Sequence, residues 1–137
     1  MTNKLNFKQV MMAGLTASAV STIINAILFF ISKKMGWITD DIFVQPNQPL
    51  TIAPVIMASI VPTLVASTVF FLIEKYTQNG FRIFSILSII LMLLSLGGPF
   101  KGIPNVTTTY ALVLSTMHCV VPLVLLYFIN RSKKSNV

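Results

Sequence analysis

The chain has 137 residues, of which 55% are hydrophobic and only 9% charged, and its mean hydropathy is +0.83. A soluble domain carries about 25% charged residues, and one of this size cannot bury so much apolar surface, which excludes a soluble globular protein. The net charge of +7 does not indicate nucleic-acid binding, because the ten Lys and Arg residues lie almost entirely at the ends of apolar segments. We therefore expect the lipid bilayer, and no nucleic acid, as a partner.

The first apolar segment predicts a membrane-spanning helix over about residues 10–32. Ala17-Ser18-Ala19 resembles a signal-peptide cleavage site, but the apolar run continues for about twelve residues beyond it, so we expect an uncleaved span. Small and polar residues recur in this span at steps of three and four: Gly14, Ser18, Ser21, Asn25 and Ser32. On a helix they share one face, which we expect to pack inward, with Asn25 as its strongest hydrogen-bonding group.

A polar connection follows Lys33 and Lys34. Trp37 predicts an interfacial turn, because an indole keeps its N–H wet and its ring in apolar surroundings at the headgroup level. Asp40 and Asp41 have no third acid nearby to complete a metal site. We interpret the two acids as the cap of a short helical turn.

The second span is predicted over residues 51–73, with Pro62 close to its middle. A proline removes a backbone donor inside a helix, so we expect a kink and a freed carbonyl near Ala58. Two interpretations remain open: Pro62 serves packing only, or it forms a hinge or a carbonyl that faces a ligand. Glu74, the only glutamate, follows this span beside Lys75. We expect the two to form a solvated ion pair that contributes little to stability.

The third span is predicted over residues 81–97. It repeats the polar stripe of the other segments: Ser85, Ser88, Met92 and Ser95. Gly97-Gly98-Pro99 is expected to stop this helix, because glycine accepts left-handed backbone angles and proline cannot continue the hydrogen-bond ladder.

The fourth span is predicted over residues 106–129 and contains the only histidine, His118. Its small and polar residues share one helix face: Thr108, Ala111, Ser115, His118 and Pro122. An ionisable group near the middle of the bilayer is a functional candidate. We expect a neutral imidazole with a neighbour such as Ser115 or Asn25, and we expect Asn25, Ser59, Ser88 and Ser115 to point into the bundle.

The basic residues predict the orientation. Seven are expected on one side (Lys4, Lys8, Lys75, Arg82, Arg131, Lys133 and Lys134) and three on the other (Lys33, Lys34 and Lys101). Both termini are therefore expected in the cytoplasm, with the protein in the cell membrane. The fold class predicted is all-α: residues 1–137 form a single domain, an antiparallel four-helix transmembrane bundle.

Three short motifs carry a family resemblance: Gln48-Pro49-Leu50-Thr51, Leu94-Ser95-Leu96-Gly97-Gly98-Pro99 and Met117-His118-Cys119-Val120-Val121. With them the chain resembles an uncharacterised bacterial family of four-span integral membrane proteins, a domain of unknown function. The resemblance implies the fold and a membrane location but no activity.

No set of catalytic groups is evident, because the spans hold no Asp, Glu, Lys or Arg well inside the bilayer. Ser115 and His118 are spaced as a nucleophile and base, yet serines are common between membrane helices, so we expect no enzyme. A single histidine is too few ligands for a metal or haem, and we expect no cofactor.

Two hypotheses for the function remain. The first is a non-enzymatic accessory subunit or binder of a lipophilic ligand, and the second is a small oligomeric proton-coupled carrier or channel in which His118 titrates. The candidate site residues are His118, Ser115, Asn25 and Pro62. A second copy of the chain or another membrane protein is the expected protein partner.

Overall fold

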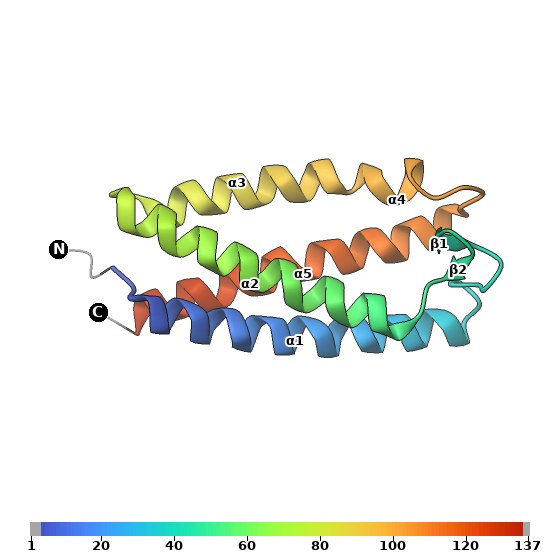
Figure 1. The fold of residues 1–137 in the computed structure, drawn as a ribbon, viewed down its shortest axis with the longest axis horizontal. Coiled ribbons are helices and arrows are strands. Elements are labelled where there is room, and N and C mark those ends of the chain that lie inside the picture. Colours follow the sequence, from blue (N-terminus) through green and yellow to red (C-terminus); the bar gives the residue numbers. More distant parts are fainter. Residues whose placement is uncertain (1–3, 136–137) are drawn as a thin grey trace.

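The computed structural model describes residues 4–135, so residues 1–3 and 136–137 of the predicted domain lie outside the described residues. The described part contains four helical segments long and apolar enough to cross a membrane: α1 (Phe7–Lys34), α2 (Ile52–Tyr76), α3 (Gly80–Ser95) continued by α4 (Gly97–Lys101), and α5 (Thr108–Lys134). Successive segments run antiparallel, and α1 begins at the end of the bundle where α5 ends (Figure 1). The predicted all-α bundle of four apolar helices is confirmed. We call the end where α1 begins the terminal end.

Side-chain caps fix where two of these helices begin. The Asn6 side chain accepts a hydrogen bond from the Gln9 N–H at 2.9 Å, and the Gln9 side chain accepts one from the Asn6 N–H at 2.9 Å. This capping box starts α1 at Phe7, and the side chain of Thr107 caps the start of α5 in a similar way.

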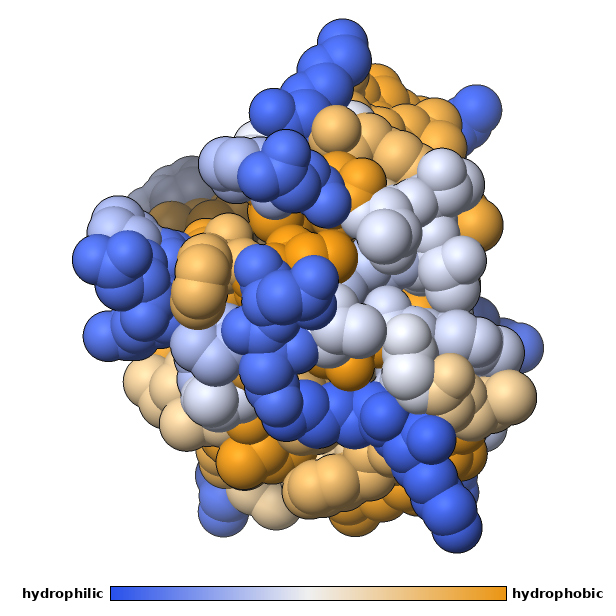
Figure 2. Space-filling model, turned by 90° about the vertical axis from the view of Figure 1, so that its right-hand side faces the viewer, coloured by the Kyte–Doolittle hydropathy of each residue, from blue (hydrophilic) through white to orange (hydrophobic). Residues whose placement is uncertain are grey.

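The opposite end of the bundle carries a short β-hairpin and is called the hairpin end. Strands β1 (Phe43–Gln45) and β2 (Gln48–Pro49) pair antiparallel around Asn47, whose φ of 58° is a left-handed conformation that asparagine tolerates. Hydrophilic side chains gather over this face of the molecule (Figure 2). The expectation of a helical turn capped by Asp40 and Asp41 is wrong, because the chain turns here without forming a helix and the Asp40 carboxylate accepts from Lys33 at 2.8 Å instead.

Helix α1 packs against α2 through small residues on both helices. The expected inward face of the first span is buried: Gly14, Ser18, Ser21, Asn25 and Ser32. Hydroxyl groups of α2 meet this face but donate to carbonyls of their own helix, as Thr63 does to Ser59 at 2.6 Å and Ser67 does to Thr63 at 2.7 Å. These α2 hydroxyls are therefore satisfied within their own helix, and the two backbones approach closely, as is usual between membrane helices.

Helix α3 is the least buried of the four long helices. Of its residues only Gly80 and Phe84 are buried, while Leu94 is 72% exposed. Phe84 packs edge-on against Phe70 of α2, with ring centroids 5.2 Å apart. This contact fixes α3 to the rest of the bundle near the terminal end.

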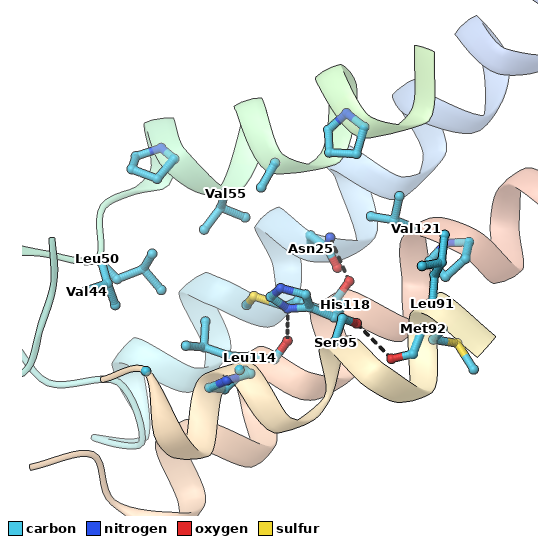
Figure 3. A pocket seen from close by; sticks show the side chains of 18 of the residues that line it. Asn25, Val44, Leu50, Val55, Leu91, Met92, Ser95, Leu114, His118 and Val121 are labelled. Carbon is cyan, nitrogen blue, oxygen red and sulfur yellow. Dashed lines mark hydrogen bonds between the residues drawn. The ribbon is translucent and has the colours of Figure 1, made fainter. Parts of the chain in front are cut away.

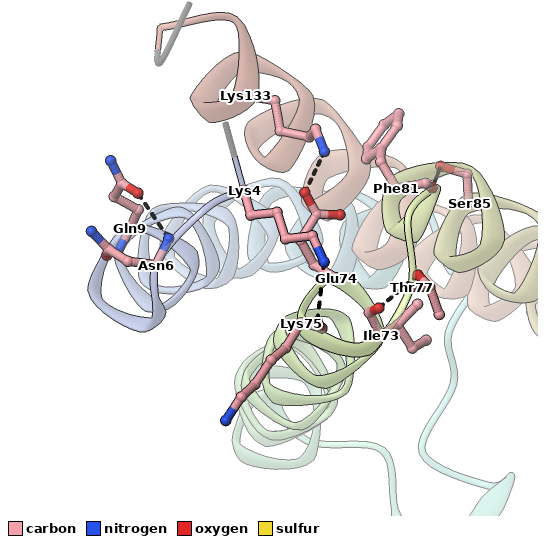
Figure 4. Close-up of polar contacts among 10 residues, drawn as sticks. All are labelled: Lys4, Asn6, Gln9, Ile73, Glu74, Lys75, Thr77, Phe81, Ser85 and Lys133. Atoms are coloured by element: carbon pink, nitrogen blue, oxygen red, sulfur yellow. Dashed lines mark hydrogen bonds and ion pairs between the residues drawn. The ribbon is translucent and has the colours of Figure 1, made fainter. Parts of the chain in front are cut away.

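The glutamate at the terminal end has a different partner from the one predicted. Glu74 is only 3% exposed and forms an ion pair with Lys133 of α5, not with Lys75 (Figure 4). Glu74 continues the buried face of α2 that includes Ser67 and Phe70, so its carboxylate turns inward, whereas Lys75 is exposed and lies over the Tyr76 ring. A solvated neighbour pair was expected because adjacency in sequence does not show which side of a helix a residue occupies.

Helix α3 ends at Ser95, just before Gly97-Gly98-Pro99, and these three residues begin the short helix α4. Leu96 keeps helical angles, with φ −63° and ψ −25°, and α4 follows at once. Pro99 is the third residue of α4, within the first helical turn, where a missing N–H breaks no hydrogen bond of that helix. The predicted end of the third helix is therefore confirmed, but the two glycines begin α4 with negative φ instead of the expected left-handed angles.

The close approach of α1 and α2 leads to a stability prediction. A Cβ added at Gly14 would lie 2.9 Å from the Cβ of Ser67 and closer still to its Oγ. Gly14→Ala should therefore lower the free energy of unfolding by about 1–3 kcal/mol, measured by denaturation in detergent, and adding Ser67→Gly should restore most of the loss. Gly97→Ala is the control, since nothing lies within 4 Å of its added Cβ. Equal stability of the Gly14 and Gly97 variants would contradict the packing described.

Candidate functional site

A half-open pocket of about 660 Å³ lies between α2, α3–α4 and α5. Asn25 of α1 contributes to its lining from behind these helices, and Val44 of the hairpin contributes at one end (Figure 3). The volume falls in the range typical of small-molecule sites, about 300–1,000 Å³. Several wall residues are too small to fill the space: Ala58 and Ala66 on α2, Ser88 on α3 and Gly98 on α4. The pocket exists because α3 packs closely only near the terminal end.

The walls, as residues 4–135 form them, are mostly apolar and carry no formal charge. Leu, Val, Met, Ala and Pro side chains supply most of the lining, and the polar side chains are Asn25, Ser88, Ser95 and His118. Side chains from all three walls converge on the same space, with His118 near its middle (Figure 3). An apolar cavity with a few polar groups is the usual form of a site for a lipophilic molecule.

His118 projects into this pocket from α5 and is exposed there. Its Nδ1 lies 2.8 Å from the carbonyl oxygen of Leu114, one turn earlier on the same helix. A carbonyl only accepts, so Nδ1 carries the proton, and in a neutral ring Nε2 keeps an acceptor lone pair. Among the described residues, neither Ser115 nor Asn25, the expected neighbours, forms a hydrogen bond with the ring.

Asn25 joins three helices at the back of the pocket. Its Nδ2 donates to Ser59 Oγ of α2 at 2.9 Å and to the Met117 carbonyl of α5 at 3.3 Å. Its side chain is 3% exposed, and its Oδ1 has no partner within the described part of the chain. Asn25 is therefore both a structural link and an acceptor at the pocket wall.

Ser115 and Pro62 lie in different surroundings. Ser115 is buried, its Oγ has no partner in residues 4–135, and it does not line the pocket. The pairing of Ser115 with His118 is thus not formed. Pro62 lines the pocket from α2, which continues as one helix from Ile52 to Tyr76.

Of the four residues expected to point inward, Asn25, Ser59 and Ser115 are buried and Ser88 lines the pocket. Sequence reasoning missed the apolar part of the wall, for example Val55, Leu91 and Val121. No signal in a single sequence separates these residues from lipid-facing ones, because both are apolar. The Pro122 position did appear on the predicted inward face of the fourth span, and it also lines the pocket.

Four long apolar helices packed around such a pocket define a helical, membrane-embedded protein. The chain belongs to the family of unknown function DUF6069, which it matches over residues 6–135. The resemblance seen in the sequence is thereby confirmed. No curated protein and no solved structure matches the chain.

The contacts of Asn25 and His118 predict unequal effects of mutation on stability. Asn25→Leu removes two interhelical hydrogen bonds and leaves Ser59 and Met117 without that donor, so it should lower the free energy of unfolding by about 1–3 kcal/mol. His118→Leu removes only a bond to the carbonyl of its own helix and should change this free energy by less than about 0.5 kcal/mol. Denaturation of both variants in the same detergent measures the difference. A larger loss for His118→Leu than for Asn25→Leu would overturn the assignment of His118 to the pocket.

Proposed function

We propose that the protein is a non-enzymatic integral membrane protein that binds a lipophilic molecule in the pocket between α2, α3–α4 and α5. The observation that carries the proposal is the pocket itself: about 660 Å³, half open and mostly apolar, in a helix bundle whose outer surface is also apolar. A lipophilic molecule dissolved in the bilayer reaches such a space without crossing water. As an accessory subunit, the protein would hold this molecule for a second copy or another membrane protein.

The second candidate function is an oligomeric, proton-coupled carrier or channel that uses His118. The exposure of the His118 ring in the pocket favours it. A conducting path, however, must continue to the other side of the bundle. Beyond the pocket, the terminal end is filled by a hydrophobic cluster that includes Phe70, Phe84, Leu125 and Ile129. A pocket closed at one end supports binding more than conduction.

The proposed location is the cytoplasmic membrane, with both termini on the cytoplasmic side. The terminal end carries basic residues from all four long helices or their ends, for example Lys8, Lys75, Arg82 and Arg131. The hairpin end carries Lys33, Lys34 and Lys101 beside Asp40 and Asp41. The excess of Lys and Arg at the terminal end supports this orientation.

Cysteine labelling tests the orientation. In a Cys119→Ser background, a membrane-impermeant maleimide should label Asn47→Cys in intact cells, because Asn47 lies in the hairpin turn. It should label Ser135→Cys at the end of α5 only after the membrane is permeabilised. The reverse pattern would place the hairpin in the cytoplasm and overturn the orientation.

Photolabelling tests the binding proposal in the membrane. An uncharged alkyl probe with a diazirine group should label the pocket segments of α3 and α5 in a saturable way, and unlabelled alkyl chains should compete. Contact of the probe with the outer helix faces should not saturate, since bulk lipid occupies them.

Two phenylalanine substitutions on α2 provide the test and its control. Ala58→Phe places a ring in the pocket and should lower the affinity of the saturable labelling by about tenfold, which corresponds to ~1.4 kcal/mol. Val65→Phe is the matched control, because Val65 is 58% exposed and does not line the pocket. Absence of saturable labelling in the parent protein, or an equal loss in both variants, would contradict the proposal.

A further inference from the structure

Two prolines that lie inside helices line the pocket: Pro62 of α2 and Pro122 of α5. A proline has no N–H, so the carbonyl four residues earlier loses its regular helical donor. The two carbonyls belong to Ala58 and His118, and both of these residues also line the pocket.

The freed carbonyls lie on the pocket side of their helices. In an α-helix the N–H of one residue points at the carbonyl four residues earlier, so a proline ring and the carbonyl it frees occupy the same helix face. Both carbonyls lie in the half of their helix nearer the hairpin end: Ala58 is about 9 Å along α2 from Ile52, and His118 is about 15 Å along α5 from Thr108.

Two side-chain acceptors join these carbonyls. Asn25 Oδ1 is buried with no partner among residues 4–135, and Nε2 of a neutral His118 ring is left free by the bond at Nδ1. The donors of Asn25 and Ser95 are already used: Asn25 donates to Ser59 and Met117, and Ser95 donates to the Met92 carbonyl at 2.7 Å. The Ser88 hydroxyl can donate as well as accept, and no Lys or Arg among residues 4–135 lines the pocket. The polar groups of the pocket are therefore predominantly acceptors.

We propose that the lipophilic ligand is an amphiphile whose head donates hydrogen bonds, a hydroxyl or an ammonium group, and that the proline-freed carbonyls receive it. This inference rests on the proposed function and adds the chemistry of the head. A buried acceptor without a donor costs free energy. A head that donates a hydrogen bond to it therefore binds more tightly than an ether of the same shape, which has no donor. A carboxylate or phosphate head would meet further acceptors and no cation.

Competition against the saturable alkyl photolabelling separates these heads. The competitors share a twelve-carbon chain: dodecanol, dodecylamine, dodecyl methyl ether and dodecanoate. Dodecanol or dodecylamine should compete at a concentration about two- to tenfold lower than the ether, the size of one net hydrogen bond, and dodecanoate should compete least. The alcohol and the amine together distinguish a neutral from a cationic head.

Proline substitutions assign the selectivity to the carbonyls. Pro62→Ala and Pro122→Ala each restore a backbone N–H inside an otherwise intact helix, so each should reduce the preference for alcohol over ether. Comparing this preference between parent and variant cancels the partitioning of each competitor into the bilayer. Pro54→Ala is the matched control, because Pro54 lines the same pocket in the first turn of α2, where an N–H has no partner within the helix.

The outcomes are distinct from those that test the proposed function. If the probe shows no saturable labelling, binding itself fails. If the ether competes as well as the alcohol and the amine, or if dodecanoate competes best, binding stands and the donating head is overturned. If Pro62→Ala and Pro122→Ala keep the full preference of the Pro54→Ala control, the role of the freed carbonyls is overturned.

Discussion

The structure depends on the close packing of α1 against α2 and α5. Gly14 lets the backbone of α1 approach Ser67, and the amide of Asn25 spans from α1 to both neighbours. In a bilayer the lipid chains are as apolar as the helix surfaces, so small residues and a few interhelical hydrogen bonds hold helices together. Helices α1, α2 and α5 pack together in this way along much of their length. The fourth, α3, does not.

The position of α3 follows from this difference and creates the pocket. Phe84 contacts Phe70 and ties α3 to α2 near the terminal end, and Pro99 of α4 is buried near the hairpin end. Between these two contacts, small residues on α2 and α3 leave a space that the chain itself does not fill. Prolines in the surrounding walls then leave carbonyls without helical donors beside that space. A small bundle can in this way place hydrogen-bond acceptors inside an apolar site without placing a charge in the membrane.

The sequence was sufficient to predict what regular periodicity determines. Apolar length predicted the helices, and the spacing of Gly14, Ser18, Ser21 and Asn25 predicted the buried face of α1, because a helix repeats every 3.6 residues. Pro62 was singled out because the chemistry of proline is local. Each of these inferences needs only residues of one helix.

Features that depend on contacts between helices were not predictable. The partner of Glu74 is Lys133, which is remote in sequence, and the β-hairpin forms in a connection too short to show a strand pattern. The pocket wall was missed because an apolar side chain facing a cavity has the same composition as one facing lipid. His118 was placed on the inner face correctly, but its neighbour is the Leu114 carbonyl of its own helix, not the expected Ser115 or Asn25.

An experimental structure of the protein, extracted together with its native lipids, tests the central claim most directly. The account predicts elongated non-protein density between α2, α3–α4 and α5, with its polar end within hydrogen-bond distance of the Ala58 or His118 carbonyl. The α1–α2 packing at Gly14 and Ser67 should be as described. A bundle in which α3 closes onto Asn25 and His118, leaving no space between them, would contradict the account.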